Sequence, residues 1–194
     1  MSPSTPLILA SSSPRRRELL RQVGLDFAVD PADLDERMLP GESAEAFAVR
    51  VAVDKARAAA GRAGNGIVIA ADTIVVLGGE VLGKPADPSD AARMLGLLSG
   101  AEHRVLTGLA VMDVRSGRME TQLACTKVWF RKLARREIEA YVATGEPLDK
   151  AGAYGIQEKG SLLVQRIEGC YFNVVGLPLA LLGETLVSFG IDLW

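Results

Sequence analysis

The sequence predicts an α/β fold in which strands and helices alternate along the chain. A short apolar run at residues 6–10 leads into a helical segment. Apolar residues recur at helical spacing over 43–62, and an almost continuous apolar run follows at 67–77, which is typical of a strand covered on both faces. Residues 103–114 and 118–130 alternate β-branched with polar side chains, as strands do.

The first helix is predicted at Pro14–Val23. Ser13 is a good N-cap residue, Pro14 suits the first helical position, and Gly24 suits the position after the helix. Arg15–Arg17 add positive charge where the helix dipole is already positive. Two interpretations fit: a phosphate cradle at the helix N-terminus, or a surface helix whose arginines face water.

A lysine lies on the apolar face of the helix predicted at Ser43–Arg62. Lys55 follows Val51 by four residues and therefore shares its apolar stripe. Its ammonium must either reach solvent at the edge of that stripe or meet an internal anion. Before this helix, a short strand is predicted at 26–29 and an acidic loop without periodicity at 30–37.

A carboxylate interrupts the apolar strand at 67–77. Asp72 needs a cation, a metal or several hydrogen-bond donors there, because an unpaired buried charge is costly. The alternative is a strand-end aspartate held by backbone N–H groups. Gly78-Gly79 predicts a hairpin turn into 80–82, which would return Lys84 toward the Asp72 end of the strand.

The remaining elements are predicted from helical spacing, alternation and turn residues. Helices are expected at 87–98, 134–143 and 178–189, and strands at 162–167 and 171–175. The two long strands meet at Ser116-Gly117. His103, the one histidine of the chain, is more typical of a hydrogen-bonding residue at a strand end than of a catalyst.

Residues 144–157 combine glycines, an Asp-Lys pair, an aromatic ring and an amide, a mixture that favours a binding loop. Tyr154 could offer a nucleotide base a flat surface while Gln157 supplies a donor and an acceptor to the base edge. A tyrosine that packs the loop is the alternative for Tyr154.

Composition excludes several classes of protein. The 194 residues suit one globular domain or two closely joined lobes, and we treat 1–194 as a single domain. A net charge of −2 argues against binding nucleic acid through bulk electrostatics. No apolar run is long enough to span a membrane, which favours a cytoplasmic protein. Cys125 and Cys170 indicate neither a disulfide framework nor a zinc site, and are expected to be small core residues with free thiols.

Four separated features together indicate phosphoryl chemistry: the basic helix N-terminus, Lys55, Asp72 and Lys84. Carboxylates can hold a hard divalent cation and orient water, while Lys and Arg stabilise phosphate charge. The sequence contains no Walker A motif, and no Gly-x-Gly-x-x-Gly follows a strand. A P-loop enzyme is therefore disfavoured.

Six motifs, in order and over nearly the whole chain, resemble those of the Maf nucleoside triphosphate pyrophosphatases. They are Ser11-Ser12-Ser13-Pro14-Arg15-Arg16, Ala71-Asp72-Thr73, Val81-Leu82-Gly83-Lys84-Pro85, Leu98-Ser99-Gly100 with His103, the block from Asp149 to Gln157, and Asn173-Val174-Val175-Gly176-Leu177-Pro178. The Asp149–Gln157 block is similar to that of the subgroup acting on dTTP and UTP.

This resemblance implies an elongated mixed β-sheet with flanking helices, related to the inosine-triphosphate pyrophosphatases, with two lobes around a central cleft. It implies hydrolysis of dTTP, UTP and modified pyrimidine nucleotides to the monophosphate and pyrophosphate by water attack at the α-phosphorus, with Mg²⁺ or Mn²⁺. It also favours a homodimer.

Residue roles follow from the same resemblance. Asp72 would accept the proton of water and bind metal with Glu36, although Asp33 and Asp35 compete with Glu36 for that role. Arg15, Thr73 and Gln157 match positions associated with substrate choice. The residues expected to contact phosphates are Ser11, Arg15, Arg16, Lys55 and Lys84.

Two other functions are weighed against hydrolysis. A nucleotide-binding regulatory protein linked to cell division would bind without significant turnover. A nucleotidyltransferase would share the basic turn and the carboxylates, but usually has a glycine-rich N-terminal loop that Ser11-Ser12-Ser13 does not supply.

Overall fold

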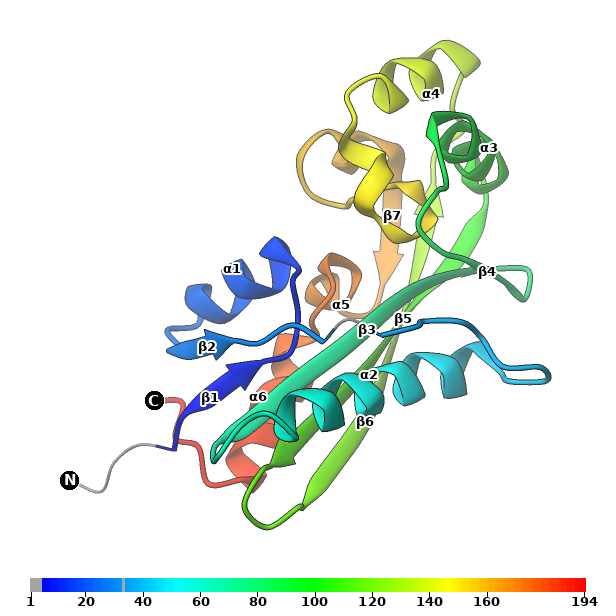
Figure 1. Ribbon diagram of the computed structural model, residues 1–194. Coiled ribbons are helices and arrows are strands. Elements are labelled where there is room, and N and C mark those ends of the chain that lie inside the picture. The colour runs from blue at the N-terminus through cyan, green and yellow to red at the C-terminus, as the bar shows by residue number, and fades with distance from the viewer. Residues whose placement is uncertain (1–4, 33) are drawn as a thin grey trace. The chain divides into compact units, whose positions relative to one another are not determined.

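The computed structural model describes residues 5–32 and 34–194. Its mixed sheet with flanking helices confirms the predicted α/β class (Figure 1). The chain divides into two compact units that are each built from separated stretches. Unit 1 comprises residues 1–72, 107–124 and 176–194, and unit 2 comprises residues 73–106 and 125–175.

The described strands form one seven-stranded sheet in the order β2-β1-β3-β5-β6-β7, with β4 paired to β3. β1 pairs in parallel with β2 and β3, whereas β4 on β3 and β7 on β6 are antiparallel. The strands are β1 (Leu7–Leu9), β2 (Phe27–Val29), β3 (Ile67–Leu77), β4 (Glu80–Leu82), β5 (Glu102–Asp113), β6 (Met119–Phe130) and β7 (Val164–Glu168).

Unit 1 contains the helices α1 (Pro14–Gln22), α2 (Ala44–Ala60) and α6 (Leu179–Ser188). α2 begins where the sequence predicts, because the Ser43 side chain accepts a hydrogen bond from the Ala46 N–H at 3.1 Å. Its alanine-rich face packs against apolar residues of β1 and β3. The helix approaches β5 so closely that a Cβ on Gly108 would lie 2.2 Å from the Ala48 carbonyl oxygen.

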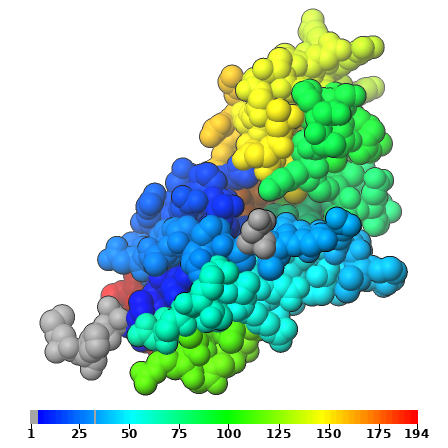
Figure 2. Space-filling model, viewed as in Figure 1, coloured from blue at the N-terminus to red at the C-terminus, as the bar shows by residue number. Residues whose placement is uncertain are grey.

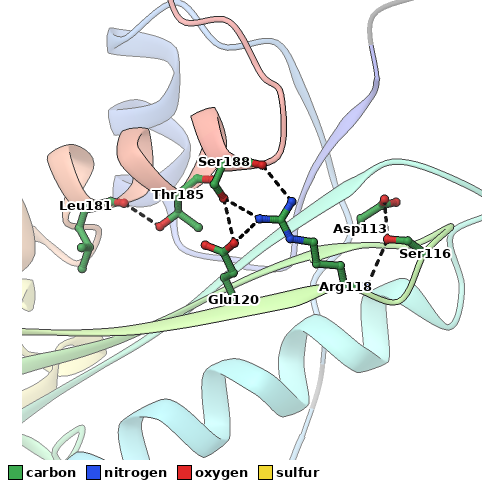
Figure 3. Close-up of polar contacts among 7 residues, drawn as sticks. All are labelled: Asp113, Ser116, Arg118, Glu120, Leu181, Thr185 and Ser188. Carbon is green, nitrogen blue, oxygen red and sulfur yellow. Dashed lines mark hydrogen bonds and ion pairs between the residues drawn. The ribbon is translucent and has the colours of Figure 1, made fainter.

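An arginine joins the C-terminal helix of unit 1 to β6 (Figure 3). Arg118 donates to the Ser188 carbonyl at 2.9 Å and to its hydroxyl at 3.2 Å, and it pairs with Glu120. Its guanidinium also lies 4.4 Å from the centre of the Phe189 ring. These contacts fix the end of α6 against the sheet.

Unit 2 contains α3 (Pro88–Leu98), α4 (Arg135–Val142) and α5 (Tyr171–Val175), together with 3-10 segments at Glu146–Asp149, Ala151–Ala153 and Glu158–Leu163. Its core includes Val75, Leu82, Leu95, Phe130 and Tyr154. The segments Glu146–Asp149 and Glu158–Leu163 carry exposed residues, in the part coloured yellow to orange in Figure 2, whereas Gly152 and Ala153 of the third segment are buried. Among the described residues, no helix is both long and apolar enough to cross a bilayer.

Three local predictions are wrong. Residues 171–175 form the helix α5 instead of a strand, because the chain leaves the β7 direction at Gly169, where φ is +125°. The Ser13 side chain makes no capping hydrogen bond to α1, although Pro14 and Gly24 behave as predicted. Cys125 is exposed and Cys170 half-buried, so neither is a core residue, although both thiols are free.

Candidate active site

The centre of the candidate site in unit 1 is the ammonium of Lys55. Its Nζ donates to Asp72 Oδ1 at 2.8 Å and lies 2.7 Å from Glu36 Oε1. Lys55 and Asp72 are only 7% and 6% exposed. Lys55 therefore meets an internal anion instead of reaching solvent, and Asp72 receives the cation that a buried carboxylate requires.

Arg16 lies beside this pair, buried at 8% exposure. Its Nε donates to the Gly176 carbonyl at 2.8 Å, and its Nη1 donates to Ser11 Oγ at 3.1 Å. Burial lowers the pKa of Arg16, while attraction by Asp72 and Glu36 opposes that shift. A guanidinium that is desolvated but faced by carboxylates is well suited to bind a phosphate oxyanion.

The three consecutive arginines occupy different environments. Arg16 is buried, whereas Arg15 and Arg17 are half-buried. Arg17 donates through Nη2 to the Ser12 carbonyl at 2.7 Å, and so braces the turn before α1. The Ser11 hydroxyl, besides accepting from Arg16, accepts the Ser13 N–H at 3.2 Å. The helix N-terminus is thus organised around Ser11 and Arg16, and the interpretation of a fully solvated basic face is wrong for Arg16.

Of the three acidic-loop candidates, Glu36 is the one that the structure brings to Lys55 and Asp72. Asp35 pairs instead with Arg37 at 3.1 Å, where both side chains are mostly exposed. Asp33 lies outside the described residues.

The carboxylates beside Lys55 provide only part of a ligand set for Mg²⁺ or Mn²⁺. Within 5–32 and 34–194, no three His, Cys, Asp or Glu side chains form a group that could hold a metal alone. Glu36 and Asp72 supply two carboxylates. One or two carboxylates plus substrate phosphates are a usual ligand set for Mg²⁺, so these residues fit a metal that arrives with a nucleotide.

The remaining predicted residues belong to unit 2. Thr73 directly follows Asp72 on β3, and Gln157 is half-buried just before the Glu158–Leu163 segment. Lys84 is exposed, two residues beyond β4, whose register pairs Leu82 with Val75 and so runs the chain back toward Thr73.

The Asp149–Gln157 block is tied to the segment that carries Lys84. The Gly152 N–H donates to the Gly83 carbonyl at 3.0 Å. A Cβ on Gly152, where φ is +67°, would lie 2.8 Å from a methyl of Val75. Only glycine allows this close approach together with that backbone conformation.

Tyr154 is a core residue, so the prediction that it offers a base a flat surface is wrong. It is 5% exposed, and its hydroxyl lies 2.8 Å from His103 Nε2. The rings of His103, Phe130 and Tyr154 pack edge to face. The prediction of a hydrogen-bonding role for His103 is confirmed, and desolvation lowers its pKa to about 4.

The sequence does not predict the contacts of two supporting groups. The Gly176 carbonyl that holds Arg16 is a backbone atom 160 positions away, and although Gly176 lies within the last of the six motifs, no residue pattern pairs it with Arg16. Asn173 donates to the Val105 carbonyl and to Thr126 Oγ1, both at 3.0 Å, and so fastens α5 within unit 2. A polar residue inside the apolar run 171–175 was the available signal for Asn173.

Known proteins are similar to this chain over most of its length. A family model described as Maf-like protein matches residues 6–189. A dTTP/UTP pyrophosphatase of Moorella thermoacetica is 54% identical over 188 residues, which cover 97% of each chain. A dTTP/UTP pyrophosphatase of Anaeromyxobacter dehalogenans is 57% identical over 176 residues, covering 90% of this chain and 89% of that protein.

The fold also has a solved counterpart. A HAM1 protein from Coxiella burnetii aligns with a TM-score of 0.55 over 95% of this chain and 99% of that chain, at 17% sequence identity. This likeness concerns the fold alone. The family match, by contrast, spans almost the entire sequence and includes all six motifs, and the chain therefore belongs to the Maf-like protein family.

Proposed function

We propose that this protein hydrolyses nucleoside triphosphates, with dTTP, UTP and modified pyrimidine nucleotides as substrates, to the monophosphate and pyrophosphate. The names of its relatives support the substrate class. The structural observation that carries the proposal is Asp72, a buried carboxylate held by Lys55 beside the buried guanidinium of Arg16. A general base next to phosphate-binding cations is what hydrolysis of an anhydride requires.

In this proposal, Asp72 accepts a proton from water as the water oxygen attacks the α-phosphorus. The new bond joins that oxygen to the α-phosphorus, and the bond to the oxygen that bridges the α- and β-phosphates breaks, so that pyrophosphate leaves. Lys55 orients Asp72 through the 2.8 Å hydrogen bond and adds positive charge near the reacting phosphate.

Phosphate binding is assigned to Ser11, Arg15, Arg16 and Lys84. Ser11 and Arg16 are already joined by a hydrogen bond, so the cradle is preorganised before substrate arrives. A guanidinium can hold two phosphate oxygens at once, whereas Lys84, exposed after β4, supplies a mobile point charge.

A divalent cation, Mg²⁺ or Mn²⁺, completes the proposal. Glu36 and Asp72 would hold it together with phosphate oxygens from the nucleotide. A bound cation of this kind would withdraw charge from the phosphates and favour departure of pyrophosphate. Base choice is assigned to Arg15, Thr73 and Gln157, because Gln157 carries both a donor and an acceptor.

The decisive experiment measures pyrophosphate and monophosphate release from a panel of canonical and modified triphosphates, with Mg²⁺ and with Mn²⁺. Asp72→Asn should lower kcat by about 10²–10⁴-fold, because the amide cannot accept the proton but can still accept the Lys55 hydrogen bond. Asp26→Asn, an exposed site with the same loss of charge, is the matched control. Unchanged turnover in a folded Asp72→Asn protein would refute this role.

The same panel separates the rival functions and tests base choice. Binding without turnover on every nucleotide would favour a regulatory protein, and turnover only with an acceptor molecule would favour a nucleotidyltransferase. Gln157→Ala should change the preference among bases more than it changes the metal requirement. An unaltered base preference would remove Gln157 from the specificity residues.

We further propose that the protein is a cytoplasmic homodimer. Light scattering on a size-exclusion column gives the assembly state, and fractionation of cells gives the location. A monomer over the working concentration range, or recovery with membranes, would refute the corresponding part.

A further inference from the structure

The acidic loop that carries Glu36 is fastened to α2 by a second basic residue besides Lys55, namely Arg50. Residues 34–43 run beside α2 and turn back into its N-terminus (Figure 1). Arg50 Nε donates to Glu42 Oε1 at 2.6 Å, and Nη2 donates to Glu42 Oε2 at 2.9 Å. Nη2 also donates to the Arg37 carbonyl at 2.9 Å. The guanidinium therefore joins both ends of the stretch 37–42 to one point on the helix.

The Glu42 carboxylate closes this stretch on itself. Its Oε2 also accepts the Leu39 N–H at 2.9 Å, and the Glu42 N–H donates to the Leu39 carbonyl at 3.0 Å. The hydrogen bonds from Arg50, and then the one from Leu39, lower the pKa of Glu42 to about 2, so this carboxylate is ionised near neutral pH. Asp54 Oδ2 accepts from Arg50 Nη1 at 3.3 Å, so a second carboxylate orients the same guanidinium.

Glu36 needs this support because its ion pair with Lys55 is a weak anchor for the loop. The Glu36 side chain is 44% exposed, although its carboxylate lies 2.7 Å from Lys55 Nζ. Ion pairs close to solvent hold a chain poorly, because water screens them and the long side chain loses rotational freedom. Arg50 instead holds the backbone itself, at the carbonyl of the next residue, Arg37.

We propose that Arg50 is a positioning residue: it fixes the backbone beside Glu36, so that Glu36 and Asp72 share Lys55 and can receive a divalent cation together with the nucleotide. This inference rests on the proposed function, because it concerns the same two carboxylates. Arg50 acts only through the loop. A planar guanidinium suits the role, since it donates to several acceptors in fixed directions, which one ammonium group cannot do.

The first test measures the Mg²⁺ concentration that gives half-maximal pyrophosphate release by the full chain. Arg50→Gln should raise this concentration by about 10-fold, the usual cost of losing a group that orients a metal ligand, but lower kcat at saturating Mg²⁺ by less than about 3-fold. In Glu36→Gln, the further change Arg50→Gln should alter it by less than about 2-fold, because Arg50 acts through Glu36. Effects that multiply in the double variant would overturn the proposal.

Two further variants on α2 separate geometry from charge. Arg50→Lys keeps the charge but loses the fork of donors, and should raise the Mg²⁺ requirement as Arg50→Gln does. Arg57→Gln removes the same charge at an exposed position of the same helix and should behave as the parent protein. A parental Mg²⁺ requirement in Arg50→Lys, or a raised one in Arg57→Gln, would show that charge on α2 acts without the clamp and would refute the proposal.

Hydrogen exchange of backbone amides tests the clamp without nucleotide, metal or turnover. The Leu39 and Glu42 amides bond within the stretch that Arg50 holds, so both should exchange about 10-fold faster or more in Arg50→Gln. The amides of β3 should keep their parental rates, which shows that the fold is intact, and Arg57→Gln should change neither set.

The two kinds of measurement separate this inference from the function on which it rests. Unaltered exchange at Leu39 and Glu42 in Arg50→Gln would refute the positioning role of Arg50, whatever the activity. A parent protein that releases no pyrophosphate would refute the proposed function instead, and amide exchange would then decide alone whether Arg50 holds the loop.

Discussion

At the scale of single residues, Lys55 determines the character of the site. Its ammonium lies within 2.8 Å of carboxylate oxygens from both Glu36 and Asp72. Asp72, only 6% exposed, would otherwise be left in a poorly hydrated position without a cation. The lysine therefore makes the acidic centre compatible with folding before any metal or nucleotide binds.

This geometry distinguishes Glu36 from its neighbour Asp35. Glu36→Gln should lower kcat/KM by about 10-fold or more and raise the Mg²⁺ concentration needed for half-maximal rate, because the proposed metal ligand and the Lys55 partner are both weakened. Asp35→Asn is the matched control, since Asp35 pairs with Arg37 at the surface. Steady-state rates across an Mg²⁺ titration provide the measurement, and equal effects of the two substitutions would contradict the assignment.

His103 predicts an acid-sensitive step in stability. Burial lowers its pKa from 6.5 to about 4. Between pH 6.5 and pH 4, His103 is therefore protonated in the unfolded chain but neutral in the folded chain. The free energy of unfolding should therefore fall by about 3 kcal/mol between pH 6.5 and pH 4, with full stability above that window.

Urea unfolding at pH values from 7 to 4 measures this loss. His103→Gln keeps a polar side chain near the Tyr154 hydroxyl but does not titrate, and its stability curve should be flatter over the same window. Parallel curves for the parent and the variant would show that other groups cause the acid sensitivity.

At the scale of elements, segments with a regular pattern were predictable and short irregular ones were not. α2, β3 and the hairpin into β4 match the prediction closely, because spacing, apolar run and Gly78-Gly79 agree with one another. α5 was missed because a segment of five residues is too short to show helical periodicity. Its conformation depends on Asn173, whose partners on β5 and β6 are distant in sequence.

The contact between α2 and β5 gives a sharp test of packing. Gly108→Ala should lower the free energy of unfolding by about 3 kcal/mol, because the new methyl group would overlap the backbone of Ala48 and a helix backbone cannot yield easily. Gly96→Ala is the matched control: it lies within α3, is exposed, and its new Cβ meets no atom within 4 Å.

Gly96→Ala should instead raise the free energy of unfolding by about 0.5–1 kcal/mol, since alanine loses less backbone entropy in a helix. Chemical denaturation of the three proteins side by side gives both values. A stability change of the same sign in both variants would contradict the close approach at Gly108.

At the scale of the whole molecule, the residues predicted best were charged side chains on otherwise apolar elements. Lys55 and Asp72 were identifiable because charges on apolar elements require partners, and the structure brings these two together. Glu36 and Thr73 were named from resemblance alone, since loop and strand positions of this kind carry no local signal, whereas Gln157 was also indicated by the mixed composition of residues 144–157. The Gly176 carbonyl could not be predicted, because tertiary folding alone brings it to Arg16.

The incomplete ligand set predicts that metal and nucleotide stabilise the protein only together. Mg²⁺ alone should leave Tm unchanged, because Lys55 already pairs with both Glu36 and Asp72 and would compete with the metal for their oxygens. A UTP analogue with a non-hydrolysable α,β-bridge, added with Mg²⁺ at about 100 times its Kd, should raise Tm by about 5–10 °C. Thermal scans with and without EDTA test this, and an equal shift with Mg²⁺ alone would indicate a complete metal site.

Because unit 1 is built from three separated stretches of chain, it can be completed only late in protein synthesis. Residues 73–106 and 125–175 complete unit 2 before the ribosome has made the last stretch of unit 1. Arg16 finds its acceptor in a carbonyl synthesised 160 residues later, which at bacterial and eukaryotic rates takes roughly 10–30 s. A nascent chain therefore lacks the Gly176 acceptor of Arg16 until synthesis is almost over, and the proposed phosphate cradle would be complete only then.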